Sequence, residues 1–586
     1  MDPLLLLLPF LAAMAYIAIS RNGKYAKYVA IAGSLASLAM LPLVSSGAYD
    51  IKWFSVGGYA FSISVVVAQL NYMLLAVILA ITPLILLFSS GFMDIMTEQR
   101  RFYVEMLAFS MAMITFSVSG SLLTMFIAWE FLSVTSYLLI GFWQSKERAN
   151  RAARKAITVV LMGDLALIGA MAIFWNAAGS LQFSAITAAA HSGNALVYAG
   201  TLVLMVAVLT KSAQFPFYDW LPDAMEGPTP VSAYLHSTTM VKAGVFAVAI
   251  LLPLFTSTGA GTILLVLAAI TVAISTYYAM TETQVKRIIA YSTVQELSLM
   301  IIALCANAVL AGIYFFFAQS FYKALLFFAA GSAMKATGKE HINEISGMRY
   351  SKIVYITTAV GVASLAGFFP FSGFFAGAGI ASSLRANLPV YIFISLVSIA
   401  TSFYIFRWLF SISKPARNRS LGIAYAALPR QMKWSMAVLA AMALGSSVFF
   451  FYADGFFKGT AYYGNGMGIG LLDGMLMVVL AAAGLGASYY LNVMKAGKAA
   501  AQEASVRKGT VADSFYVKFS NFAYHLSEGA GLFDTHISDL FDHLGKIAVD
   551  LGIGFRRFSV GEINAYALIF VAGLLLLFAY AYVVLR

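Results

Sequence analysis

The sequence has little charge for its length. Only 11% of its 586 residues are Asp, Glu, Lys or Arg, against about 25% in soluble domains, while 61% are hydrophobic. That composition excludes one large soluble domain, and it excludes a disordered chain, which needs low hydrophobicity. A chain surrounded mostly by lipid accounts for it.

Cysteine is nearly absent as well. Cys305 is the only one, which excludes an internal disulfide and an iron–sulfur cluster, since a cluster needs about four Cys. The glycines 464, 466, 468 and 470 lack the spacing and the preceding strand of a dinucleotide-binding fingerprint. We therefore expect no cofactor and no metal in this chain, and any electron transfer must take place elsewhere.

Long apolar runs are what the sequence does contain, each about the 20 residues that a spanning helix needs. They predict an all-α polytopic membrane protein with about 16 transmembrane helices. The predicted spans are 3–20, 28–47, 69–92, 103–118, 120–142, 156–176, 196–217, 231–255, 261–281, 287–306, 308–334, 353–380, 389–413, 432–453, 467–492 and 562–585. Residues 50–66 alternate around Gly57-Gly58 and predict a short hairpin outside the membrane.

The basic residues give an orientation, because Lys and Arg concentrate in cytoplasmic loops. Loops after odd-numbered helices hold 29 of the 37 basic residues, and the opposite side holds four. Both termini are then predicted on the non-cytoplasmic side of a cell (plasma) membrane. The net charge of +12 follows from this topology and requires no nucleic acid.

The remaining charges fall inside predicted spans. They are Lys211, Lys242, Lys323 and Arg407, with the acids Glu130, Asp164 and Glu296. Each costs about 2.5–3.5 kcal/mol at mid-membrane, so such groups normally face a bundle interior or a wet path. Lysine suits a proton carrier because its charge state responds strongly to its surroundings. A static ion pair, a polar cap at Asp164 and a snorkelling Arg407 remain the alternatives.

Two predicted helices are interrupted by Pro. Phe215-Pro216-Phe217 follows Lys211, with His236 just after this break, and Phe369-Pro370-Phe371 interrupts the twelfth span. Paired breaks in two halves of a transporter indicate an inverted repeat with its ion path at the breaks. We assign one five-helix repeat to helices 4–8 and the other to helices 9–13.

The polar stretch 495–561 has apolar residues at spacings of three and four, which predicts a long amphipathic helix along the cytoplasmic side of the membrane. Its Asp534, His536, Asp539, Asp542 and His543 are assigned to a solvated face rather than to a metal site. The predicted segments are 1–102 (three helices), 103–255 (first repeat), 256–413 (second repeat), 414–494 (two helices), 495–561 (lateral helix) and 562–586 (C-terminal anchor).

Several motifs carry a family resemblance. They are Trp129-Glu130-Phe131-Leu132-Ser133, the run from Lys211 through His236 to Lys242, Ala290-Tyr291-Ser292-Thr293 and Phe321-Tyr322-Lys323-Ala324-Leu325-Leu326. They resemble the antiporter-like, proton-pumping subunits of respiratory complex I, NADH–quinone oxidoreductase, and the tail resembles that of subunit L (subunit 5).

The resemblance implies roles for the charged residues. Glu130 and Lys211 form the charge pair, and His236 is the relay. Lys323 carries the proton in the second half. Asp164 matches an acidic position of the sixth helix, and Lys242 lies where the family is less regular in charge. The implied partners are other complex I-like membrane subunits along the lateral helix, iron–sulfur and quinone-site subunits, and the lipid bilayer.

Three departures from the family pattern affect four positions. The histidines usual before Lys323 are Phe315 and Gln319, the lysine usual in the twelfth helix is Gly377, and the usual glutamine after the Tyr-Ser-Thr motif is Glu296. Our hypothesis is that Glu296 and Lys323 carry the second half with water filling the gap. The alternative is that only the first half translocates ions.

The sequence favours a proton-translocating subunit that couples electron transport elsewhere in the complex to pumping. Three other functions remain open: a cation/proton antiporter subunit, a membrane subunit of a hydrogenase or an inorganic-carbon uptake system, and a scaffold that translocates nothing.

Overall fold

The computed structural model describes residues 1–20, 23–56, 59–94, 98–415, 419–460 and 466–495. By its contacts the chain divides into two units, Met1–Ile51 with Ser62–Ala496, and Lys52–Phe61 with Gly497–Arg586. The helical bundle described below belongs to the first unit. The predicted lateral helix with its Asp/His cluster and the predicted span 562–585 lie outside the described residues.

The described chain is mostly helical. Its first part contains α1 (Leu8–Ile19), α2 (Ala26–Met40), α3 (Gln69–Phe92), α4 (Gln99–Ser117), α5 (Leu122–Ile140), α6 (Glu147–Ala178), α7 (Phe183–His191) and α8 (Ala195–Lys211). The middle contains α9 (Trp220–Asp223), α10 (Thr229–Ser237), α11 (Met240–Ile250), α12 (Leu252–Thr258), α13 (Ala260–Thr281), α14 (Val285–Cys305) and α15 (Val309–Thr337). The last part contains α16 (Lys352–Leu365), α17 (Ser372–Ser383), α18 (Leu388–Ile412), α19 (Arg419–Ala426), α20 (Arg430–Phe457) and α21 (Leu471–Tyr489).

Short turns complete the list. They are the 3₁₀ turns η1 (Pro3–Leu7), η2 (Gly23–Tyr25), η3 (Leu41–Leu43), η4 (Ala224–Glu226) and η5 (Met348–Tyr350), and the π-helical turn η6 (Tyr490–Lys495). Strands β1 (Gly47–Val56) and β2 (Tyr59–Val67) pair as a two-stranded sheet, which confirms the predicted hairpin.

The helices agree well with the predicted spans. Eleven of those described are long and apolar enough to cross a membrane, and three shorter apolar ones accompany them. Each of the first 15 predicted spans overlaps helical structure. The total of 16 and the inverted repeat stay predictions.

Two interruptions of the helices were predicted from their prolines, and a third was not. Helix α8 ends at Lys211, ahead of Pro216, and α16 and α17 are separated by residues 366–371, which contain Pro370. Both follow from the missing N–H and fixed φ of proline. A third break separates α10 from α11 at Thr238 and Thr239, where no Pro or Gly marked it.

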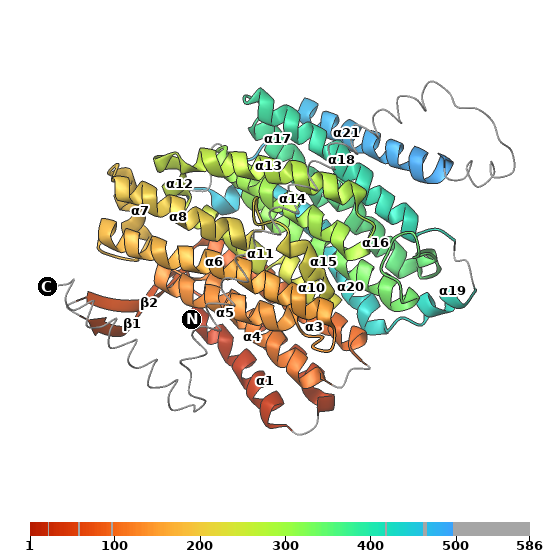
Figure 1. Ribbon diagram of the computed structural model, residues 1–586, viewed down its shortest axis with the longest axis horizontal. Coiled ribbons are helices and arrows are strands. Elements are labelled where there is room, and N and C mark those ends of the chain that lie inside the picture. The colour runs from red at the N-terminus through yellow and green to blue at the C-terminus, as the bar shows by residue number, and fades with distance from the viewer. Residues whose placement is uncertain (21–22, 57–58, 95–97, 416–418, 461–465, 496–586) are drawn as a thin grey trace, which may run out of the picture. The chain divides into compact units, whose positions relative to one another are not determined.

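Four helices form the buried centre of the bundle. Figure 1 shows α10, α11, α14 and α15 between α3–α5 on one side and α17, α18 and α21 on the other. The spans of α10–α11, α14 and α15 are about nine-tenths buried, whereas only 33–39% of the span residues of α13, α18 and α21 are buried. The outer helices thus present apolar surface suited to lipid, and the central ones are enclosed by protein.

Small residues bring α6 and α8 close together. A Cβ on Gly163 would overlap the side chain of Thr210, and one on Gly200 would press on the Phe174 ring. Because Gly carries no Cβ, the helices approach at these points more closely than larger residues allow, as is common in membrane bundles.

Alanine substitutions test this close contact. Gly163→Ala places a methyl group against Thr210, whereas the matched Gly169→Ala on the same helix meets only ordinary contact with Val203. We expect Gly163→Ala to cost about 1–3 kcal/mol through overpacking, and Gly169→Ala to stay within about 1 kcal/mol. Thermal unfolding in detergent compares them, and equal midpoints would contradict the close α6–α8 contact.

Candidate functional site

Lys211 lies in a closed polar cluster at the end of α8. Its Nζ is 3.6 Å from Asp164 Oδ1 and donates hydrogen bonds to the Trp129 carbonyl (3.1 Å) and to Ser133 Oγ (2.5 Å). The ammonium also lies 4.8 Å from the centre of the Trp129 ring, a favourable cation–π position. Lys211 is completely buried, so these contacts replace its hydration.

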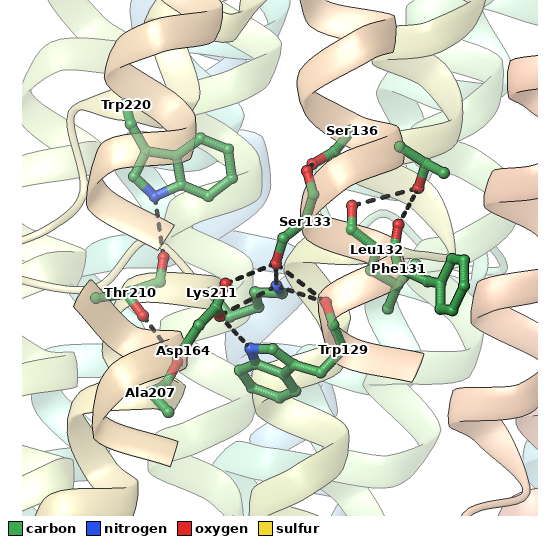
Figure 2. Close-up of polar contacts among 11 residues, drawn as sticks. Trp129, Phe131, Leu132, Ser133, Ser136, Asp164, Ala207, Thr210, Lys211 and Trp220 are labelled. Atoms are coloured by element: carbon green, nitrogen blue, oxygen red, sulfur yellow. Dashed lines mark hydrogen bonds and ion pairs between the residues drawn. The ribbon is translucent and has the colours of Figure 1, made fainter. Parts of the chain in front are cut away.

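Asp164 is held from two sides in the same cluster. Trp129 Nε1 donates to its Oδ1 at 2.6 Å, and Ser133 Oγ donates to its Oδ2 at 2.8 Å. Figure 2 shows these side chains converging between α5, α6 and α8, with Phe131 pointing away. The Trp129 and Ser133 side chains therefore fix both charged groups.

The α6–α8 contact explains why Asp164 is the partner. Gly163 meets Thr210, and the next residues along the two helices are Asp164 and Lys211. In the described part of the chain, Asp164 is the carboxylate within 4.0 Å of Lys211. The expected charge pair of Glu130 with Lys211 is not such a direct contact and stays a prediction.

Glu130 lies instead toward the side of the bundle. It is half-buried, and the next residue, Phe131, is 60% exposed, as is much of Val134 one turn later. Its carboxylate is therefore close to a surface that a neighbouring subunit or lipid would cover.

The end of α8 connects directly to α11, which carries Lys242. Ser212 Oγ donates to the Val241 carbonyl at 3.0 Å, and a Cβ at Gly244 would overlap Ser212. The residue after Lys211 therefore contacts the residue before Lys242.

Lys242 is fully buried without a carboxylate within 4.0 Å in the described chain. Its Nζ donates to the Phe316 carbonyl (2.6 Å) and to Ser320 Oγ (2.5 Å), and lies 4.4 Å from the centre of the Phe316 ring. These contacts come from α15, and Ser320 is three residues, or about one turn, before Lys323. Lys242 therefore contacts the same face of α15 that carries Lys323.

Lys323 forms the second buried ion pair. Its Nζ is 2.6 Å from Glu296 Oε2 and donates to Ser292 Oγ at 2.8 Å. Tyr322 donates to Glu296 Oε1 (2.8 Å) and Gln319 to Oε2 (3.2 Å). Ser292 and Glu296 are four residues apart on α14, and Gln319 and Lys323 are four apart on α15, so one face of each helix supplies the site.

His236 lies after the Pro216 break, in the last turn of α10 and immediately before the Thr238–Thr239 break. Its ring packs on Phe327 with 4.9 Å between centroids. Neither ring nitrogen has a hydrogen-bond partner in the described chain, and the same holds for the buried hydroxyls of Ser237 and Thr238. Buried polar groups are almost always hydrogen-bonded, so water is the natural partner here.

Arg407 has a structural contact. Its guanidinium on α18 donates to the carbonyls of Ala279 and Glu282, at the end of α13, and so satisfies acceptors that a helix C-terminus leaves free.

Two buried carboxylates inside predicted spans escaped the sequence analysis: Glu105, which is 8% exposed and pairs with Arg101, and Asp473. Asp473 lies inside the predicted span 467–492 and is 3% exposed. The signal was present, since any acid within a predicted span deserves the same attention as Glu130. By contrast, the serines that bind the lysine ammoniums gave no signal, because Ser is common in membrane helices.

The positions that depart from the family pattern come together in space. Gln319 binds Glu296, and Phe315, Gly377 and Glu296 line one cavity. The described residues contain no group of three or more His, Cys, Asp and Glu placed to hold a metal ion.

A membrane bundle with two buried lysine–carboxylate pairs, joined by a third buried lysine, defines the antiporter-like class of membrane subunits. Residues 119–403 match the family model for the transmembrane part of NADH:quinone oxidoreductase/Mrp antiporters, and residues 53–103 match the N-terminus of complex I chain 5.

Curated relatives include NADH-quinone oxidoreductase subunit L of Escherichia coli (strain K12), 35% identical over 370 residues, which are 61% of this chain and 60% of that protein. Subunit 5 of an NAD(P)H-quinone oxidoreductase from Paulinella chromatophora is 33% identical, over 61% of this chain and 57% of the relative. The chain thus covers under two thirds of the length of either.

Among solved structures, a chain of the Mrp complex from Dietzia sp. DQ12-45-1b shares the fold. Its TM-score is 0.73 at 20% identity, covering 99% of this chain and 63% of that one.

Removing either acid tests which one is the partner of Lys211. Asp164→Asn keeps the shape of the side chain but removes the charge, and breaking a buried pair from one side costs about 3–5 kcal/mol. The matched Glu130→Gln removes a half-buried acid that has no such contact, so we expect little loss of stability. Thermal unfolding of both variants decides, and a larger loss for Glu130→Gln would reverse the assignment.

Proposed function

We propose that this chain is a proton-translocating membrane subunit of a complex I-like NADH/quinone oxidoreductase. The observation that carries the proposal is the line of buried charge Asp164–Lys211, Lys242 and Lys323–Glu296, which is linked through Ser212–Val241 and through α15. Four buried residues hold the ammonium groups of these lysines by hydrogen bonds: Trp129 and Ser133 at Lys211, Ser320 at Lys242 and Ser292 at Lys323. The matched family models support the same function.

The arrangement suits proton transfer better than metal-ion transfer. Each station is a lysine, which donates hydrogen bonds and offers no lone pair to a cation while it is charged. A proton can leave the ammonium for its carboxylate without separating charge, because the pair then becomes neutral. A change of charge at one lysine changes the electrostatic potential at the next lysine, and this coupling can pass energy along the bundle.

His236 supports a hydrated segment beside this line. Its two ring nitrogens and the hydroxyls of Ser237 and Thr238 are buried polar atoms that have no hydrogen-bond partner among the described residues. They are suited to hold water between the α10–α11 break and Lys323. The two places are close because the His236 ring packs on Phe327, which lies four residues after Lys323 on α15.

We also propose the setting. The chain lies in a plasma membrane with both termini on the non-cytoplasmic side, as its basic residues predict. Its partners are other membrane subunits, with the iron–sulfur and quinone-site subunits that carry the electrons in the same complex, since we expect no redox cofactor in this chain.

An Mrp-type cation/proton antiporter is the second candidate, because the matched family model describes the transmembrane part of both classes. A hydrogenase or carbon-uptake subunit and a scaffold have no specific observation in their favour.

Purification of the native complex separates the two candidates. We expect iron–sulfur proteins and a quinone-site subunit to copurify with this chain, identified by mass spectrometry and by the electron paramagnetic resonance of reduced clusters. Recovery of antiporter subunits alone would overturn the first candidate and support the second.

Proton transport tests the buried line. In the assembled complex in proteoliposomes, Lys323→Met removes the charge that pairs with Glu296, so proton uptake per electron should fall well below that of the wild type. Lys339→Met is the control, since that lysine is mostly exposed. Intact pumping by Lys323→Met would refute the assigned role of the second half.

A further inference from the structure

A cavity of about 60 Å³ lies beside the Lys323–Glu296 pair. One water needs roughly 10–15 Å³ of such space together with polar partners, so the cavity has room for several. Its polar lining comes from Gln295, Glu296, Tyr322, Ser398 and Thr401. One wall is the acid that holds Lys323, so water in the cavity reaches the proton-carrying group directly.

Glycines from the α16–α17 break and from α17 itself also line the cavity. Gly367, Gly373 and Gly377 all line the cavity. Gly373 is fixed by packing, because a Cβ there would overlap the Ser364 carbonyl. At Gly377 a Cβ would meet no atom within 4 Å, so the space there is open and the position accepts a side chain.

Asp473 lies beyond this cavity. Its carboxylate accepts hydrogen bonds from Tyr391 (2.9 Å, to Oδ1) and from Ser382 (3.0 Å, to Oδ2). Arg385 Nη1 is 3.8 Å from Oδ2, and the Arg385 side chain is 59% exposed. A nearly buried acid is therefore joined to a cation at the surface.

Helix geometry places the Asp473 group one turn from the cavity on three helices. Each of the three helices has one residue that lines the cavity and one that belongs to the Asp473 group, three or four positions away. The pairs are Ala378 and Ser382 on α17, Ile394 and Tyr391 on α18, and Met477 and Asp473 on α21. One turn is about 5.4 Å. All three steps lead to the side that carries Arg385, which the distribution of basic residues assigns to the non-cytoplasmic face.

We propose that the cavity and Asp473 form the outward proton exit of this chain, an inference that rests on the proposed function. The Lys323 ammonium gives its proton to the Glu296 carboxylate. The resulting acid protonates water in the cavity, and a proton passes along that water to the Asp473 carboxylate. Asp473 releases it to outside water beside Arg385. Lys323 is left neutral and Glu296 ionised, ready for the next proton.

Two substitutions test the exit in the assembled complex in proteoliposomes. Asp473→Asn keeps the acceptors for Tyr391 and Ser382 but cannot carry a proton, and Gly377→Leu fills the cavity. We expect each to lower proton uptake per electron as far as Lys323→Met does. Asp473→Glu should restore at least half of the loss, which a structural role alone would not do.

The control is Asp454→Asn. Asp454 is also an acid near the outer end of its helix. Its carboxylate accepts from the Met467 backbone N–H, and it is not among the residues that line the cavity. It should pump like the wild type.

The outcomes separate the two proposals. Suppose that Lys323→Met abolishes pumping, while the single variants Asp473→Asn and Gly377→Leu both pump like the wild type. The proposed exit is then wrong and the proposed function stands. If Lys323→Met also pumps normally, the proposed function fails and the exit with it. Should Asp473→Asn not assemble, Gly377→Leu decides, because its side chain enters open space: normal pumping then overturns the exit, and reduced pumping supports it.

Discussion

The cost of burying charge in an apolar bundle constrains every other feature of this protein. Lys211, Lys242 and Lys323 are wholly enclosed, and an isolated ion there is far too costly to keep. Each ammonium is therefore surrounded by a compensating group: a carboxylate for Lys211 and Lys323, and a carbonyl, a hydroxyl and an aromatic face for Lys242. The three solutions differ in kind, since Lys211 and Lys323 each have a carboxylate within 4.0 Å and Lys242 has none among the described residues.

The backbone is adapted to the same constraint. Gly163 lets α6 approach α8 so that Asp164 meets Lys211, and Gly244 lets α11 approach Ser212. The helix breaks lie where polar groups collect: Lys211 ends α8, His236 precedes the α10–α11 interruption, and the α16–α17 interruption opens on the cavity beside Glu296. Interrupted helices expose backbone groups, which a membrane interior tolerates only inside protein or next to water. Close packing and broken helices are thus two means to one end, a polar path within an apolar shell.

Much of the fold could be predicted from the sequence, because lipid imposes a simple rule on it. A spanning helix needs about 20 apolar residues, so the spans were visible as apolar runs. The hairpin was visible from the alternation of residues 50–66, and two helix breaks from their prolines. The break at Thr238 and Thr239 was not, since neither residue disfavours a helix by itself. Among the site residues, scarcity of charge singled out Lys211, Lys242, Lys323, Asp164 and Glu296. It did not show that Asp164 is the acid in direct contact with Lys211, and the buried acids Glu105 and Asp473 were overlooked.

The sequence by itself determined which residues are charged inside the membrane, since each one stands out against a background that is 61% hydrophobic. Only the tertiary structure decided which of them meet. Pairing depends on the rotation and approach of helices far apart in the chain, and these are set by packing contacts such as Gly163 with Thr210 that leave no periodic signal. The same holds for the cavity at Gly377. A glycine is an empty position in the sequence, and whether that emptiness is filled by a neighbour or left open for water depends on the helices around it.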